Sequence, residues 1–154
     1  MDVTEDEKGK RGVEIAAMWW PIKPTGQFSY DDCSGIDAWL DGEPIQIKYD
    51  GLSNETGNVL HEIYEKDPGH PEQPWRGLGQ KAKWYIWVNE EWALKVSMDS
   101  LAQKEVGRTL RSTNNGGTSL GFLIPATELT QMPGSQVHWH GVGGLEDTRS
   151  EDDK

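Results

Sequence analysis

Apolar and polar residues repeat along the chain with two different periods, and these periods predict where helices and strands lie. In residues 4–20 the apolar residues recur at the spacing of one helix face, which favours a helix there. Thr4 with Glu7 three positions later matches an N-terminal capping box, and acidic residues in this first turn suit a helix N-terminus. Pro21 follows the segment and ends the predicted helix.

Two β-rich runs on either side of an Asp-Gly pair carry the strongest local signal. Residues 36–40 (IDAWL) predict one strand, and residues 44–49 (PIQIKY) predict another. Asp41 and Gly42 between them are residue types that accept the positive φ angles of a tight hairpin turn. We therefore expect the two strands to pair as an antiparallel hairpin.

The remaining pattern completes an α/β protein. Residues 67–79 contain three prolines and three glycines, so they are expected to form a loop. Further strands are predicted over residues 58–66, 84–88, 92–96 and 119–124, a helix over 99–111 and a short helical turn over 125–129. This order predicts an α/β fold with a mixed central sheet flanked by helices.

Charge divides the chain into a body and two acidic ends. The 154 residues include 26 acidic and 15 basic side chains, a net charge of −11, whereas residues 12–145 hold 17 acidic and 10 basic ones. We expect a flexible acidic N-terminus over residues 1–9, one domain over 10–135 and a disordered acidic tail over 136–154. The charge excludes a cationic nucleic-acid coat protein, but not an enzyme that meets nucleic acid in one local cleft.

Cysteine content and hydropathy indicate the compartment. Cys33 is the one cysteine, which excludes an intrachain disulfide framework and fits a reducing environment. No run of 18 apolar residues predicts a transmembrane span, and the charged N-terminus does not match a secretory signal. We therefore expect an intracellular, cytoplasmic protein without membrane contact.

The hairpin also carries the candidate chemistry. Because side chains alternate along a strand, Gln46 and Lys48 share one face, and the hairpin register brings Asp37 beside them. Carboxylate and amide oxygens are ligands for a hard divalent cation, and a lysine can neutralise charge on a phosphate or orient a water molecule. This set of residues predicts hydrolysis of a phosphodiester bond.

The run from Gly35-Ile36-Asp37 to Gln46-Ile47-Lys48 resembles the active-site hairpin of the PD-(D/E)xK nuclease superfamily, the restriction-endonuclease-like fold. In that family an acidic residue on a first helix precedes an Asp on one strand and (Asp/Glu)-x-Lys on the next. Glu14 matches the helical acid, Asp37 the strand Asp and Lys48 the lysine. The order of predicted elements resembles the family over about residues 10–130.

Two positions depart from the family pattern. Ile36 stands where the family has Pro, and Gln46 stands where it usually has Asp or Glu. Gln46 keeps an oxygen ligand but removes one negative charge, so either Glu14, Glu43 or Glu62 compensates for it or the site binds its metal weakly. We expect Glu62 and the nearby Glu65 to face solvent rather than the site.

The resemblance implies a Mg²⁺-dependent DNA endonuclease, with Mn²⁺ as a substitute. Asp37 would be the main metal ligand, Gln46 and the Ile47 carbonyl would complete the inner sphere, Lys48 would act on water and phosphate, and Glu14 would assist. The family includes phage and viral nucleases, so a phage or viral source is consistent with it. A homodimer would give so small a domain more surface for reading DNA.

Residues that could contact nucleic acid lie outside the hairpin. Trp75 and Arg76 offer a stacking surface beside a guanidinium group in the predicted loop. Lys104, Arg108 and Arg111 would share one side of the predicted helix as a backbone-contacting stripe.

Other functions stay open. Gln46 favours a catalytically inactive relative that keeps the fold as a binding module, and the charge of −11 suits an acidic DNA-mimic inhibitor. Eight tryptophans would suit a carbohydrate-binding surface, although packing is the simpler role for them. His138 and His140 could bind zinc with other histidines, but their spacing does not match a paired zinc motif. The polar face of the hairpin could also be plain solvated surface.

Overall fold

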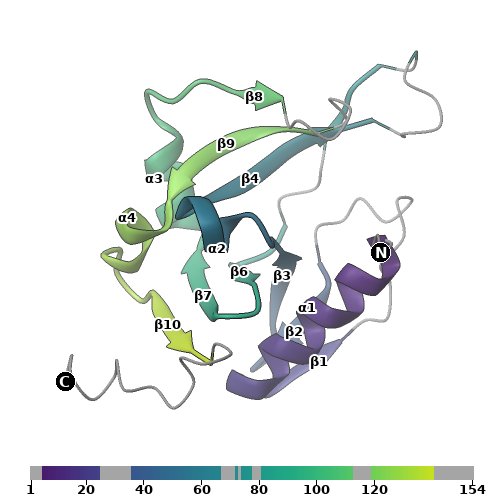
Figure 1. The fold of residues 1–154 in the computed structure, drawn as a ribbon, viewed down its shortest axis with the longest axis vertical. Helices are drawn as coiled ribbons and strands as arrows, with labels where there is room; N and C mark the ends of the chain where they lie inside the picture. The colour runs from purple at the N-terminus through teal and green to yellow at the C-terminus, as the bar shows by residue number, and fades with distance from the viewer. Residues whose placement is uncertain are drawn as a thin grey trace.

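The computed structural model describes residues 5–24, 36–66, 72, 74–77, 81–112 and 119–140. Its strands form two sheets (Figure 1). The first sheet has the strand order β1 (Ile22–Pro24), β2 (Ala38–Leu40), β3 (Glu43–Tyr49), β6 (Trp84–Val88), β7 (Trp92–Ser97) and β10 (Gln136–Trp139). The second has the order β5 (Arg76–Gly77), β4 (Asn58–Glu65), β9 (Ser119–Pro125) and β8 (Arg111–Ser112). The helices are α1 (Glu5–Trp19), α2 (Ser53–Thr56), α3 (Met98–Glu105) and α4 (Ala126–Thr130).

The predicted hairpin is confirmed at the centre of the first sheet. β2 and β3 are antiparallel, with Ala38 opposite Ile45, and Asp41 and Gly42 adopt φ angles of 51° and 82° in the turn. β3 then pairs in parallel with β6, whereas the other pairs of this sheet are antiparallel. The sheet is therefore mixed, and the predicted α/β class is confirmed.

Different layers cover the two faces of the first sheet. α1 covers one face, where its Ile15 and Ala16 join Ile45 and Ile86 in an apolar cluster. A second cluster, on the other face, unites side chains of both sheets with residues of α3 and α4. The prediction of helices on both flanks is thus only half right, because the second sheet takes much of the place of a helical layer. Figure 1 shows β4 and β9 above the first sheet, with α1 beside β2 and β3.

The first helix begins earlier than the predicted domain boundary. α1 starts at Glu5, so residues 5–9 are helical and do not form a flexible N-terminus. Arg11 anchors the helix to the β6–β7 turn, where its guanidinium nitrogens donate to both carboxylate oxygens of Glu90 at 2.9 and 2.6 Å. A charged segment thus forms a helix here, because packing and this ion pair fix it.

The C-terminal segment contradicts the predicted disordered tail over its first residues. Residues 136–139 form β10, which pairs with β7 at the sheet edge. The ring of His138 stacks on Trp19 of α1 with centroids 4.5 Å apart, and Trp19 Nε1 donates to His140 Nδ1 at 3.0 Å. Strand pairing and aromatic contacts therefore order these residues. Residues 141–154 of the predicted tail lie outside the described residues.

The second predicted helix is too long. α3 ends at Glu105, since Val106 already has the extended angles φ −61° and ψ 125°. Val106 is 82% exposed, although the helical spacing predicts that it points inward. Arg111 lies beyond the helix and begins β8, where it pairs with Gly121 of β9. The strand pairing at this position outweighs the local helical pattern.

A β-bulge and a glycine bring β4 and β9 unusually close together. The register between these strands shifts between Glu62 and Tyr64. A Cβ atom on Gly121 would lie 2.3 Å from the His61 carbonyl oxygen and 2.9 Å from Glu62 Cα. Only glycine fits this position without moving the backbone of β4.

Gly121→Ala is therefore expected to lower the free energy of unfolding by about 1–3 kcal/mol, the usual cost of overpacking. Gly51→Ala is the matched control, because its Cβ would meet only Tyr49 Cε1 at an ordinary 3.6 Å. Urea unfolding of both variants measures the difference. Equal stability of the two variants would contradict this reason, because it would show that the β4 backbone moves aside at no cost in stability.

Candidate active site

Backbone and side-chain hydrogen bonds fix Asp37 at the end of the hairpin. Its N–H donates to the Ile45 carbonyl at 2.8 Å, which continues the β2–β3 ladder by one residue. Its Oδ2 accepts the N–H of Ile47, also at 2.8 Å. The carboxylate is thereby held against the middle of β3. This agrees with the predicted register, which places Asp37 beside Gln46.

Gln46 and Lys48 lie on the face of β3 away from α1. Ile45 and Ile47 between them pack with the α1 cluster, so alternation turns Gln46 and Lys48 to the opposite face. In the parallel ladder Gln46 lies beside Tyr85, which belongs to the apolar cluster of the second sheet. The predicted common face is confirmed, and it points toward the second sheet.

Glu62 of β4 completes this group from the opposite layer. Its carboxylate forms an ion pair and hydrogen bond with the Lys48 ammonium, and the residue is only 7% exposed. Burial acts to raise the pKa of Glu62, but the charge and hydrogen bond of Lys48 and a hydrogen bond from Ser119 outweigh it and lower the pKa. The prediction that Glu62 faces solvent is wrong, because the edge of β4 lies against the first sheet.

Asp50 is a further buried carboxylate, which the sequence pattern did not single out. It follows β3 and accepts the N–H of Ser53 on Oδ1 at 3.1 Å and the N–H of Leu60 on Oδ2 at 3.3 Å. Burial raises the pKa of Asp50 despite these hydrogen bonds. An Asp side chain often accepts a backbone N–H a few residues further on, which explains the first hydrogen bond but not the second.

Tyr85 stands between the carboxylates. It is fully buried, and burial together with the charges of Glu62, Asp37 and Asp50 raises its pKa well above the ordinary value. Neither its hydroxyl nor the buried Oε1 of Gln46 has a hydrogen-bond partner among the described residues. Three carboxylates, a lysine and two unpartnered oxygens therefore surround one buried polar region, in which ordinary packing would place apolar groups.

The sheet separates the other proposed acids from this region. Glu14 lies on α1, its side chain is 66% exposed, and it accepts a hydrogen bond from Arg11 at 3.3 Å. Glu43 shares the face of Ile45, and it accepts the indole N–H of Trp84 at 2.9 Å. The structure thus brings Glu62 to Lys48 and leaves Glu14 and Glu43 on the α1 side.

The donor set suits a hard cation with few carboxylate ligands. The described residues contain no group of three His, Cys, Asp or Glu side chains that could hold a metal ion. The predicted ligands are instead one carboxylate, Asp37, with the Gln46 amide oxygen and the Ile47 carbonyl. The buried, unpartnered Gln46 Oε1 is an oxygen of the type that Mg²⁺ takes, so the residues present fit the predicted group.

The predicted nucleic-acid contacts fall in two places. The Lys66 ammonium lies 4.8 Å from the centroid of the Trp75 ring, and Arg76 contributes backbone to β5, while its side chain lies outside the described residues. Lys104 and Arg108 both reach the carboxylate of Glu128, at 3.4 and 2.6 Å. Arg111 is on a strand, so the predicted stripe on one side of a helix is wrong.

The histidines do not form a common site in the described part of the chain. His138 and His140 contact Trp19 of α1, whereas His61 is buried beside Tyr85, with its Nδ1 2.7 Å from a Glu105 oxygen. Each of these three histidines thus packs against an aromatic ring.

Comparison with family models, curated proteins and solved structures finds no match to this chain. No helix in the described ranges has the length and apolar character needed to cross a membrane. A proposal of function for this chain therefore depends on the residues of the polar region.

Replacement of Glu62 by Gln is expected to lower the free energy of unfolding by about 1–2 kcal/mol at neutral pH, because Lys48 loses its carboxylate partner. Since the folded pKa of Glu62 lies below 4.5, its stabilisation is complete above pH 4.5 and is lost as the pH falls through the folded value. The difference between wild type and variant should therefore shrink below pH 4.5. Urea unfolding at several pH values measures it.

Glu55→Gln is the control for this change, because Glu55 is exposed on α2. A wild-type advantage over Glu62→Gln that stays constant down to pH 3 would contradict the ion pair as its cause.

Proposed function

We propose that this protein is a Mg²⁺-dependent DNA endonuclease of the PD-(D/E)xK type, built on a restriction-endonuclease-like hairpin. The observation that carries the proposal is the common face of Asp37, Gln46 and Lys48, which meets Glu62 from the second sheet. A carboxylate, an amide oxygen and an ammonium group in one partly buried region are the functional groups that metal-assisted phosphodiester hydrolysis requires.

Each residue has a separate role in this proposal. Asp37 and Gln46, with the Ile47 carbonyl, would hold Mg²⁺, which when bound supplies positive charge for the phosphate and a more acidic water. The Lys48 side chain is 33% exposed, so its ammonium can reach a phosphate oxygen or a water at the surface of the site. Glu62 holds this ammonium in one direction through their ion pair and hydrogen bond.

Glu62 also supplies the negative charge that Gln46 lacks. The family pattern has a carboxylate at position 46, two residues before the lysine. Here the carboxylate comes from β4 and reaches the same lysine from across the sheet interface. Glu14 has no such access, because α1 lies on the opposite face.

A second candidate is a nucleic-acid-binding protein without catalysis. The same ion pair favours it, because a lysine already neutralised by Glu62 has less charge to offer a phosphate. Mg²⁺ titration by calorimetry discriminates the two: the nuclease should bind the ion through Asp37, whereas the inactive relative should not bind it.

Asp37→Asn and Lys48→Met are expected to lower Mg²⁺-dependent DNA cleavage by at least about 100-fold, the order of effect of removing a charged group that acts on the transition state. Asp37→Asn keeps an oxygen that can accept the Ile47 N–H, so folding should persist. The assay follows cleavage of duplex, single-stranded and branched DNA with Mg²⁺ or Mn²⁺.

Two matched variants control for general effects of lost charge. Asp41→Asn makes the same change in the exposed hairpin turn, where asparagine tolerates the φ of 51°, and Lys81→Met removes an exposed lysine. Both should cleave like wild type. If wild type cleaves none of the substrates with either metal, the enzyme proposal is wrong.

A second pair of variants tests which glutamate serves the site. Glu62→Gln should lower cleavage by about 10-fold or more, because Lys48 loses the group that directs it, whereas Glu14→Gln should stay within about two-fold of wild type. Initial rates at saturating Mg²⁺ measure both. A strong loss in Glu14→Gln with little effect in Glu62→Gln would contradict the assignment of Glu62.

A further inference from the structure

An exposed tryptophan lies in a surface hollow at the edge of the first sheet. The hollow has a volume of about 470 Å³ and is lined by Pro21, Lys23, Trp39, Asp41 and Gly42. Trp39 is 41% exposed, and Lys23 of β1 lies opposite it in the strand register. The volume falls in the range of roughly 300–1,000 Å³ that is usual for sites of small organic groups. The hollow can therefore hold a flat group against the Trp39 ring.

This hollow lies on the face of the first sheet that carries the candidate active site. Both neighbours of Trp39 in β2 pack in the α1 cluster, so Trp39 points to the opposite face. Trp39 lies opposite Pro44, and Gln46 follows Pro44 on the same side of β3. Asp37 precedes Trp39 by two residues, which separates their backbones by about 7 Å. The hollow is thus next to the polar region on a shared face.

The second sheet covers only part of this face. Tyr85 and Trp87 of β6 lie on it, pack with residues of the second sheet and are fully buried. Trp39 of β2 lies on the same face and remains 41% exposed. The face is therefore open toward the edge formed by β1 and β2, beside the polar region.

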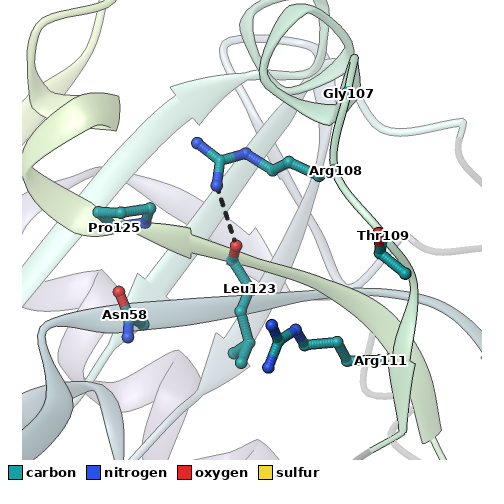
Figure 2. A pocket seen from close by; sticks show the side chains of 7 residues that line it. All are labelled: Asn58, Gly107, Arg108, Thr109, Arg111, Leu123 and Pro125. Carbon is teal, nitrogen blue, oxygen red and sulfur yellow. Dashed lines mark hydrogen bonds between the residues drawn. The ribbon is translucent and has the colours of Figure 1, made fainter.

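A hollow of similar size elsewhere does not share this position. It lies at β9 and β8, where Arg108, Arg111 and Leu123 are among its lining residues (Figure 2). Leu123 points to the outer face of the second sheet, because the next residue, Ile124, packs in the cluster between the sheets. Of these two hollows, the one at Trp39 is next to the polar region.

The chemistry of the hollow at Trp39 fits a nucleobase better than a phosphate. Lys23 and Asp41 carry opposite charges, so they offset one another and leave the aromatic ring as the main binding surface. Every base has a face that stacks on an aromatic ring. A base inside a duplex is already stacked and paired, so an unpaired base is the one that can enter. Stacking also suits a protein with a net charge of −11, because it needs no positive charge.

We propose that Trp39 stacks on an unpaired base of the DNA substrate, about two nucleotides from the phosphate that is hydrolysed at Asp37. The spacing follows from the 7 Å between the two residues, which corresponds to roughly two nucleotides at about 3.4 Å each. The inference rests on the proposed nuclease function and adds the class of substrate. That substrate is DNA with a single-stranded stretch at the point of cleavage.

The binding experiment is done in EDTA, so that metal-dependent cleavage does not interfere. Wild type and variants are titrated into a labelled 12-nucleotide strand of thymidines and into a duplex of the same length, and fluorescence anisotropy is followed at several salt concentrations. Wild type should bind the single strand more tightly than the duplex. Trp39→Leu should weaken single-strand binding by at least about 5-fold, the effect of losing one stacked base, while its duplex binding stays that of wild type.

Two further readouts separate stacking from other effects. The salt slope of Trp39→Leu should equal that of wild type, because a stacked base releases no counterions from the DNA. Trp39→Phe keeps an aromatic ring and should retain most of the affinity. Tyr64→Leu is the matched control, since it removes a ring that is 37% exposed on the second sheet, and it should bind like wild type. Thermal unfolding checks that each variant is folded.

The cleavage experiment tests the spacing. In Mg²⁺, the position of a cut in a single strand is mapped, and a second strand is made that lacks the base about two nucleotides from that cut. Wild type should cut the second strand more slowly, whereas Trp39→Leu should cut both strands at the same rate. Equal rates for wild type on the two strands would contradict the assigned position of the base.

The inference is overturned if Trp39→Leu binds the single strand as wild type does, or if Tyr64→Leu loses as much affinity. It is also overturned if wild type binds no single strand, or if Trp39 binds the neutral oligosaccharide cellohexaose and no DNA. The two proposals fail separately. Loss of single-strand binding by Trp39→Leu in EDTA supports the base site even when wild type cleaves nothing, and that result contradicts the nuclease alone.

Discussion

The ion pair between Lys48 and Glu62 joins two sheets whose other shared contacts are largely apolar. A carboxylate as buried as that of Glu62 would cost several kcal/mol if it had no partner, so its position depends on the ammonium from the opposite layer. Asp37, Gln46 and Tyr85 lie on the face of the first sheet from which Lys48 reaches Glu62. Glu62 reaches this contact from the point where the β4 register shifts and where Gly121 of β9 comes close to β4.

The positions of the charged residues explain more about this protein than its net charge does. Carboxylates gather around Tyr85, where burial raises the pKa of Asp50 and Lys48 lowers that of Glu62. A region with this balance would attract a divalent cation and repel a phosphate that arrives without one.

Local signals in the sequence predicted the central hairpin, and long-range contacts determined what surrounds it. The Asp-Gly turn and the alternation of residues 44–49 placed Asp37, Gln46 and Lys48 on one face, because turn chemistry and strand period act within a few residues. Alternation cannot say which layer covers that face, so the burial of Glu62 was missed. The predictions of a helix to residue 111 and of disorder at residues 136–139 were wrong for the same reason. Pairing of Arg111 with β9, and of residues 136–139 with β7, outweighed local propensity.

The parallel pairing of β3 with β6 has a consequence for assembly. Two parallel neighbours cannot be joined by a tight turn, so the chain leaves the first sheet after β3, builds α2, β4 and β5, and returns as β6. The residue that completes the polar region is carried on this crossover. Even when every strand of the first sheet has formed, Glu62 reaches Lys48 only after the crossover packs against that sheet. The polar region is therefore completed by tertiary packing of the crossover and not by strand pairing within the first sheet alone.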